Sequence, residues 1–222
     1  MLFSNENWAK KPTEQSYKSP LAFTAEVNNY LQQDKYKPVK KHGIVITGSS
    51  SVRVWQPDIH NDFTQIDIIA RGFGGSNMND LLYFSDALIT QYQPRAVAIY
   101  EGDNDIAQGI SPELILKKFI ELNNKIKQAL PDIRMYFISI KPSIARQSMW
   151  PKMVATNQLI QEACNVMEHC TYIDVASKLL EGGLPKQDVF IEDGLHLNKK
   201  GYQLWSEAVV GVIEANETYK NQ

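Results

Sequence analysis

Short apolar runs alternate along this chain with longer stretches in which apolar residues recur every three or four positions. The short runs are rich in β-branched and aromatic residues and stop at glycine, serine or charged residues, which is typical of buried strands. Five such runs occupy residues 43–47, 66–70, 96–100, 134–140 and 171–174.

The stretches between these runs have the spacing of amphipathic helices. The clearest one opens with Ser111 as N-cap, Pro112 at the first helical position and Glu113 in the first turn. A helix between each pair of strands predicts an α/β fold with a doubly wound, mostly parallel sheet. Its helices cover both faces because such crossovers are right-handed. The predicted helices span residues 77–90, 112–129, 151–168 and 198–216.

The region before the first strand has a different character. Residues 1–20 are polar and predict an irregular arm. Thr24 is predicted as the N-cap of a short helix over residues 24–33, and a basic connector leads from there to the first strand. We expect residues 1–42 to pack on a single domain formed by residues 43–222, because no linker divides the chain.

Composition narrows the possible partners. A chain of 222 residues with 43% hydrophobic and 22% charged residues suits one large globular domain. The net charge of −2, with both signs interspersed, does not predict the basic surface patch that nucleic-acid binding requires. No apolar run approaches the ~20 residues of a membrane span. Leu2 and Phe3 are followed by polar residues rather than by a signal-peptide core, so a cytoplasmic protein and an already processed exported protein are both expected possibilities.

The two cysteines, Cys164 and Cys170, lie late in a predicted helix and just before a predicted strand. We expect two partly buried free thiols, with a disulfide as an alternative that the spacing does not favour. No Cys-x-x-Cys or His-Glu-x-x-His pattern occurs, so the sequence predicts no zinc site.

The loops that follow the strands are the place to look for a site, because the carboxyl ends of parallel strands share one edge of the sheet. The first strand runs into Gly48, Ser49, Ser50 and Ser51, where a turn and a helix start are predicted. A serine nucleophile at this point would need a base, a group that orients the base, and donors for an oxyanion.

One of the four histidines has a partner pattern. His42 precedes the first strand, at the opposite edge of the sheet, and His60 and His169 are interpreted as surface or packing residues. His196 follows Asp193 by three residues, with a glycine between them that permits a tight turn. This spacing lets the carboxylate reach the imidazole and fix its tautomer.

Two further loops could supply oxyanion donors. The glycine-rich loop 71–77 is either a plain turn or a source of an exposed backbone N–H, and it does not fit the dinucleotide pattern Gly-x-Gly-x-x-Gly. Asn104, between Gly102 and acidic neighbours, is either a loop or capping residue or a side-chain amide donor.

Together these residues resemble the SGNH hydrolases, also called the GDSL lipase/esterase family. The four blocks that define the family occur in its order, one per loop, and the resemblance covers about residues 43–210. The blocks read Gly48-Ser49-Ser50, Arg71-Gly72-Phe73-Gly74-Gly75, Gly102-Asp103-Asn104-Asp105 and Asp193-Gly194-Leu195-His196.

The resemblance implies a flavodoxin-like three-layer α/β/α sandwich with about five strands, no metal and no cofactor. It implies Ser50 as nucleophile, His196 as base and Asp193 as the acid that orients it. The implied oxyanion hole is formed by Ser50, Gly75 and Asn104, with Gly74 as the alternative glycine.

One position departs from the family pattern. Ser49 stands where the family usually has aspartate, so the choice of Ser50 over Ser49 or Ser51 rests on the alignment of the block. The missing aspartate is not the acid of the triad, and the resemblance therefore still implies a serine esterase.

The implied substrate is a small-molecule ester. No long apolar lid is present, which favours short acyl groups such as acetyl, and Arg146 and Trp150 in the segment after the fourth strand are candidates for substrate binding. A carbohydrate O-acetyl esterase and a lysophospholipase-like lipase are alternatives. A different class, a non-catalytic flavodoxin-like module that binds a small anion at residues 48–52, would not need Asp193, His196 or Asn104.

Overall fold

The computed structural model describes residues 16–217 of the chain. The irregular arm predicted for residues 1–20 therefore lies mostly outside the described residues. The described part opens with a short coil, a 3₁₀ turn at Pro20–Phe23 and the helix α1 at Thr24–Tyr36.

Five strands form one parallel sheet in the order β2-β1-β3-β4-β5. The strand order reverses between β1 and β3, and ligand sites of such sheets lie outside the carboxyl ends of the strands at this point. A separate antiparallel pair, β6 and β7, joins Leu180–Glu181 to Leu184–Pro185. The five strands are Ile44–Gly48 (β1), Ile68–Gly72 (β2), Ala96–Tyr100 (β3), Arg134–Ile138 (β4) and Cys170–Ile173 (β5).

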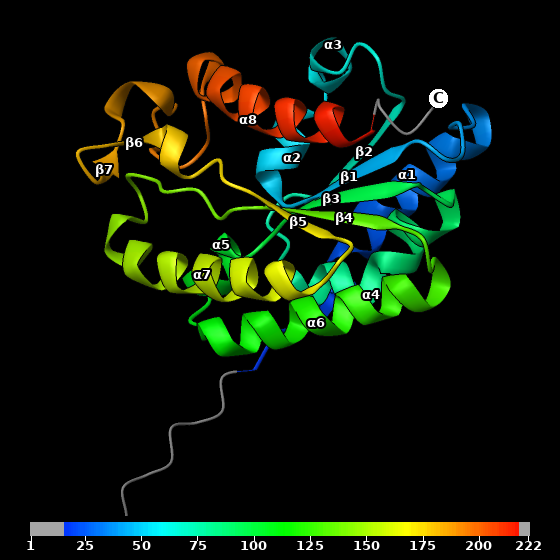
Figure 1. Cartoon of the computed structure of the whole chain (residues 1–222), viewed down its shortest axis with the longest axis horizontal. Coiled ribbons are helices and arrows are strands. Elements are labelled where there is room, and N and C mark those ends of the chain that lie inside the picture. The colour runs from blue at the N-terminus through cyan, green and yellow to red at the C-terminus, as the bar shows by residue number, and fades with distance from the viewer. Residues whose placement is uncertain (1–15, 218–222) are drawn as a thin grey trace, which may run out of the picture.

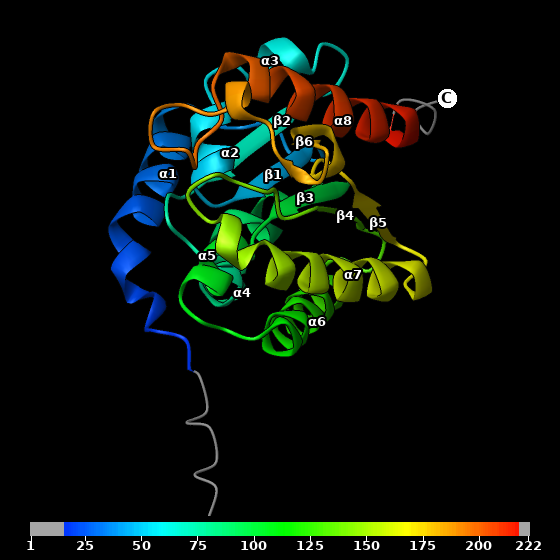
Figure 2. The same cartoon turned by 90° about the vertical axis from the view of Figure 1, so that its left-hand side faces the viewer.

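Helices cover both faces of the sheet, and Figures 1 and 2 show α2, α3 and α8 on one side and α4, α6 and α7 on the other. Successive strand residues point into two separate cores: Val45 faces the core under α4, α6 and α7, whereas Ile44 and Ile46 face the core under α2 and α8. The predicted three-layer fold is thus confirmed. The remaining helices are α2 (Ser50–Trp55), α3 (Ile59–Asp62), α4 (Met78–Leu88), α5 (Asp103–Ala107), α6 (Pro112–Ala129), α7 (Trp150–Val166) and α8 (Lys199–Glu217).

Local signals set most boundaries. Ser111 caps α6 by accepting from Leu114 N, as predicted, and Asn77 caps α4 in a reciprocal pair with Asp80. The fourth strand ends two residues earlier than predicted. The backbone N–H and C=O of Ile140 bond to the side chain of Asn157 at 2.8 and 2.9 Å, and so they leave the ladder.

The prediction that Thr24 is the N-cap of α1 is wrong. The preceding residues already form a helical turn, so Thr24 has helical backbone angles and its hydroxyl donates to Leu21 O at 2.8 Å. The helix also continues to Tyr36 and includes the beginning of the predicted connector.

The expectation of two free thiols is also wrong. Cys164, in the last turn of α7, and Cys170, the first residue of β5, form a disulfide with their Cα atoms 4.8 Å apart. Met167 N–H donates to Cys164 O, and Cys170 N–H donates to Met167 O. This tight reversal brings the end of the helix onto the start of the strand, which the spacing of the cysteines alone does not indicate.

Candidate active site

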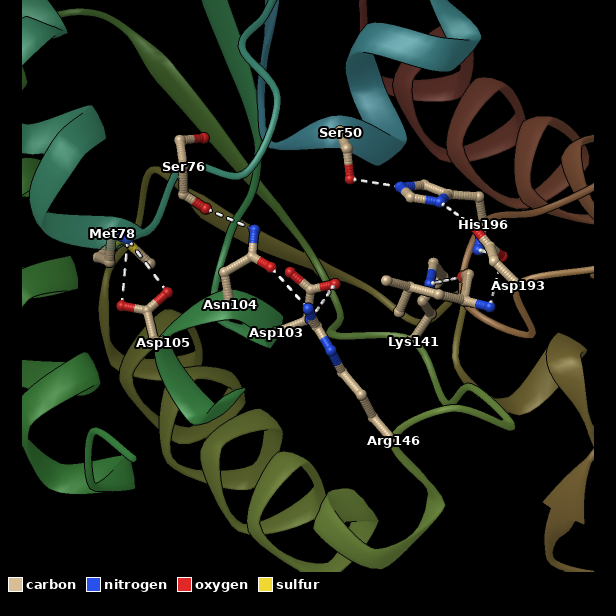
Figure 3. Close-up of polar contacts among 11 residues, drawn as sticks. Ser50, Ser76, Met78, Asp103, Asn104, Asp105, Lys141, Arg146, Asp193 and His196 are labelled. Atoms are coloured by element: carbon tan, nitrogen blue, oxygen red, sulfur yellow. Dashed lines mark hydrogen bonds and ion pairs between the residues drawn. The ribbon is translucent and has the colours of Figure 1, made fainter. Parts of the chain in front are cut away.

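Three segments far apart in the sequence meet at the carboxyl edge of the sheet (Figure 3). Ser50 is the first residue of α2, directly after β1, and Asn104 lies in α5, directly after β3. Asp193 and His196 come from the turn that precedes α8. The edge predicted from the loops is therefore the place where these side chains gather.

The backbone of the first loop decides which of the three serines is presented. Gly48 has φ +139°, and a Cβ on it would lie 2.1 Å from Tyr100 O, so only glycine fits between the strands here. Ser49 and Ser51 are buried, and Ser49 Oγ has no hydrogen-bond partner among the described residues. Ser50 is half-buried and points toward His196.

A continuous series of hydrogen bonds joins Ser50, His196 and Asp193. His196 Nε2 lies 2.9 Å from Ser50 Oγ, and His196 Nδ1 lies 2.6 Å from Asp193 Oδ2. An ionised carboxylate only accepts hydrogen bonds, so Nδ1 carries the proton and Nε2 is free to accept from the serine hydroxyl.

The Asp193 carboxylate is held by backbone N–H groups of its own turn. Asp193 Oδ1 accepts from Leu195 N at 2.8 Å and from His196 N at 2.9 Å. Desolvation raises the pKa of Asp193, but these two bonds and the bond from the His196 ring together outweigh it and lower the pKa to about 2. The carboxylate is therefore ionised wherever the protein is folded near neutral pH.

Both ends of the Asn104 amide have partners. Its Nδ2 donates to Ser76 O at 2.8 Å, and its Oδ1 accepts from Arg146 Nη2 at 2.9 Å. Arg146 also pairs with Asp103, with 3.2 Å between Nη1 and Oδ2. Since the oxygen faces a guanidinium, the amide NH₂ is fixed on the other side, and its second N–H can still donate.

The two candidate glycines differ in what their N–H groups contact. Gly74 N–H donates to Glu26 Oε1 of α1 at 3.2 Å, and Glu26 lies 3.6 Å from Arg53. Gly75 has φ +86°, faces open space, and has no acceptor for its N–H among the described residues. Tyr30 OH supports the same loop by donating to Gly72 O.

Acidic side chains are buried directly behind this loop. Glu101 is fully buried, with Oε1 2.6 Å from Ser76 Oγ, and burial together with the charge of Asp105 raises its pKa well above the usual range. Burial likewise raises the pKa of Asp105 to about 7 and that of Asp80 to about 6. Ser76 Oγ also lies 2.9 Å from Phe73 O, so its single proton has two acceptors within reach.

One buried cation was not singled out by the sequence. Lys141 follows β4, is 1% exposed, and donates from Nζ to Leu195 O at 2.7 Å. A lysine immediately after an apolar strand, at the edge that carries the site, is the signal that could have indicated it. The contacts of Glu26 and Ser76 with the site had no such signal, because they depend on how α1 and α4 pack.

The two predicted substrate-binding residues lie in different surroundings. Arg146 contacts Asn104 and Asp103, as described above. Trp150 begins α7 and lines a separate hollow of about 230 Å³, together with Tyr172 and Asp174. Ser50, Asp193 and His196 do not line that hollow.

The other histidines lie away from this series. His42 precedes β1, His60 is exposed in α3, and His169 bonds to Asn123 of α6 at 2.8 Å. Between residues 16 and 217, no group of three or more His, Cys, Asp or Glu side chains is arranged to hold a metal ion. No helix within these residues is long and apolar enough to span a membrane.

A serine, an imidazole and a carboxylate in series, beside unpaired N–H groups, have the geometry that a hydrolase with a serine nucleophile requires. The profile of the GDSL-like lipase/acylhydrolase family matches residues 40–204, and the chain belongs to this family. It is thus a carboxylic ester hydrolase, and the resemblance seen in the sequence is confirmed. No curated protein sequence matches the chain.

Solved structures share the fold at low sequence identity. A chain from Streptococcus pneumonia, named after platelet activating factor, gives a TM-score of 0.76 at 22% identity, over 87% of this chain and 94% of its own. A GDSL-like lipase from Bacteroides thetaiotaomicron gives 0.74 at 18% identity, with coverages of 86% and 98%. A catalytic mutant of an acetylxylan esterase from Geobacillus stearothermophilus gives 0.62 at 11% identity, with coverages of 79% and 95%.

Proposed function

We propose that the chain is a serine esterase that hydrolyses short-chain, acetyl-type esters of small molecules through an acyl-enzyme. The hydrogen-bond series from Ser50 through His196 to Asp193 is the observation that carries this proposal. In the first step Ser50 Oγ attacks the ester carbonyl while His196 Nε2 takes its proton. Asp193 keeps the imidazole in the required tautomer and stabilises the imidazolium that forms.

The oxyanion of the tetrahedral intermediate is bound by three N–H donors. Ser50 N–H belongs to the first turn of α2 and has no intrahelical acceptor, and Gly75 N–H is likewise unpaired among the described residues. Asn104 Nδ2 is the third donor. Gly74 is excluded from this role in the proposal because its N–H already donates to the carboxylate of Glu26.

The remaining steps reverse the same proton transfers. The imidazolium gives its proton to the alcohol oxygen as the ester C–O bond breaks, which leaves acetyl-Ser50. His196 then takes a proton from water, the resulting hydroxide attacks the acyl carbonyl, and Ser50 Oγ leaves with that proton. Neither an oxidant nor a further reactant is needed.

A carbohydrate O-acetyl ester is a second candidate substrate. The separate hollow at the start of α7 combines Trp150 and Tyr172 with the polar side chains of Gln158, Gln161 and Asp174, a lining that suits a sugar ring. Trp150 follows Arg146, which bonds to Asn104, by four residues in the chain. The acetylxylan esterase of the same fold fits this substrate class.

The experiment that tests the proposal is labelling with a serine-directed aryl phosphonate. We expect the label on Ser50, no label in Ser50→Ala, and a turnover of an aryl acetate in that variant lower by about 10⁴-fold or more. Ser16→Ala, at an exposed position, is the matched control and should behave as the wild type. Full activity in Ser50→Ala would refute Ser50 as the nucleophile, and absence of any label on the wild type would favour the anion-binding module instead.

The two substrate classes are separated by a panel of aryl esters of graded chain length and acetylated xylo-oligosaccharides. If the sugar candidate is right, Trp150→Ala raises KM for the acetylated sugars and leaves KM for the aryl acetate unchanged. Equal effects on both would remove the hollow from the substrate-binding surface.

A further inference from the structure

Lys141 is a fully buried cation with few partners. Its ammonium has three donors, yet it makes one hydrogen bond, to Leu195 O at 2.7 Å, and otherwise lies 5.8 Å from the centre of the Phe190 ring. Burying a cation costs free energy unless charges or hydrogen bonds compensate for it. The place of Lys141 in the site indicates what its burial contributes to the protein.

The segment that begins at Lys141 contacts both halves of the site (Figure 3). Besides the bond from Lys141 to Leu195 O, Ala145 N–H donates to Gly194 O at 3.0 Å. At the other end of the segment, Arg146 donates to Asn104. The turn that carries the imidazole and the amide of the oxyanion side are therefore supported by one stretch of chain.

Leu195 lies between the two functional residues of its turn. A bond to its carbonyl fixes the peptide plane immediately before His196, and hence the direction in which the imidazole leaves the backbone. The position of Lys141 is itself fixed, because Asn157 clamps the neighbouring Ile140 through both backbone groups. A rigid element thus holds a turn whose own bonds are all local.

We propose that Lys141 is a positioning residue for the hydrolysis, holding the turn 193–196 so that the imidazole meets Ser50 and linking that turn to the support of Asn104. The inference rests on the proposed function, since it assigns Lys141 a part in the same reaction. Lys141 does not touch the reacting atoms and acts through Leu195.

The charge of Lys141 gives a second readout. Burial lowers the pKa of Lys141 to about 8, and repulsion by the charge of Arg146 also lowers it. The negative charges of Asp103 and Asp193 act in the opposite direction and raise it. Above that pH the ammonium loses a proton and its bond to Leu195 O weakens. Turnover of the wild type is therefore expected to fall several-fold above pH 8 at constant KM.

The test compares Lys141→Met, Lys141→Gln and the exposed control Lys117→Met on an aryl acetate. A misplacement of about 1 Å can cost about 10²-fold, so we expect kcat of Lys141→Met to be about 10- to 100-fold lower with KM nearly unchanged. Lys141→Gln keeps a donor and should lose less, and it should lack the alkaline decline. Lys117→Met should match the wild type in both respects.

Proton NMR supplies a readout that needs no substrate. The low-field signal of His196 Nδ1–H, bonded to Asp193, should broaden or move upfield in Lys141→Met and stay unchanged in Lys117→Met. Circular dichroism gives the folded fraction. If Lys141→Met does not fold, Lys141→Gln and the alkaline decline of the wild type decide the question.

Three results would overturn the role of Lys141. One is an unchanged kcat and NMR signal in Lys141→Met, another is a loss of kcat that equals the loss of folded protein, and the third is an alkaline decline that persists in Lys141→Gln. A wild type that hydrolyses no ester and takes no phosphonate label would instead refute the proposed function, and the NMR comparison would still test the positioning.

Discussion

The two halves of the candidate site are held in different ways. In the turn 193–196 the carboxylate bonds to groups two and three residues away, and its side chain is 42% exposed. Asn104, in contrast, is held by Ser76 and Arg146, which lie 28 and 42 residues away in the chain. One half is a turn whose carboxylate is held within four residues, with Lys141 and Ala145 bonding to its backbone from outside. The other half exists only when distant loops have packed.

The halves also differ in how they respond to protons. Asp193, with its pKa lowered to about 2, adds stability above its unfolded pKa of about 4 and loses that contribution as the pH falls toward 2. Behind the oxyanion side, Asp105 and Asp80 have pKa values raised to about 7 and about 6. Their neutral forms favour folding at low pH, and this contribution is lost as the pH rises from about 4 through 7.

The largest effect is expected in the local turn. His196→Ala removes the proposed base, and we expect kcat on an aryl acetate to fall by about 10⁴- to 10⁶-fold with little change in Tm. His60→Ala, exposed in α3, is the control. A fall of less than about tenfold would mean that the series from Ser50 to Asp193 does not act as a unit.

A smaller loss is expected on the packed side. Asn104→Ala removes one of three proposed oxyanion donors, which typically costs about 10²- to 10³-fold in kcat. Asn61→Ala, at an exposed position in α3, should leave kcat unchanged. If Asn104→Ala keeps wild-type turnover, Asn104 is only a structural part of the loop.

Arg146 tests whether the packed side works through Asn104. Arg146→Met should lower kcat about tenfold, because the amide loses the partner that fixes its orientation. In the double variant with Asn104→Ala the two losses should not add, since both act on one donor. Additive losses accompanied by a higher KM would show that Arg146 contacts the substrate directly, as the sequence first suggested.

The smallest effect concerns the buried acids. Asp105→Asn is neutral at every pH, and its amide oxygen can still accept from Met78 N–H, so the decline in stability between about pH 4 and 7 should flatten. At pH 8 we expect Tm to rise by about 2–4 °C, on the order of 1 kcal/mol. Asp132→Asn, at an exposed position, should change neither. An unchanged pH dependence in Asp105→Asn would rule out this cluster as its source.

The same contrast explains what the sequence could predict. The alternation of apolar runs and amphipathic stretches was sufficient for the five strands and the long helices, because burial of those patterns determines the layers. Asp193 and His196 were singled out because their spacing lets one turn join them, whereas the choice of Ser50 among three serines rested on the family resemblance. The structure brings these three side chains into hydrogen-bond contact.

What the sequence did not indicate depends on contacts between distant segments. Glu26 and Lys141 reach the site only after α1 and the segment following β4 have packed against it, and the bond from Arg146 to Asn104 depends on the same packing. The disulfide was missed because it requires the reversal between α7 and β5. Thr24 was misassigned because a helical turn with Ser19 as its N-cap and Pro20 as its first residue already precedes it, so Thr24 lies inside helical structure.

The contacts of α1 bear on where the catalytic unit of this protein begins. The family match starts at residue 40, yet Glu26 and Tyr30, upstream of it, bond to Gly74 N–H and Gly72 O. A chain shortened to the matched region would keep all four sequence motifs. It would lose the two hydrogen bonds with Glu26 and Tyr30 that support its glycine-rich loop. The part of the chain that supports the glycine-rich loop of the site therefore begins upstream of the matched region, in α1.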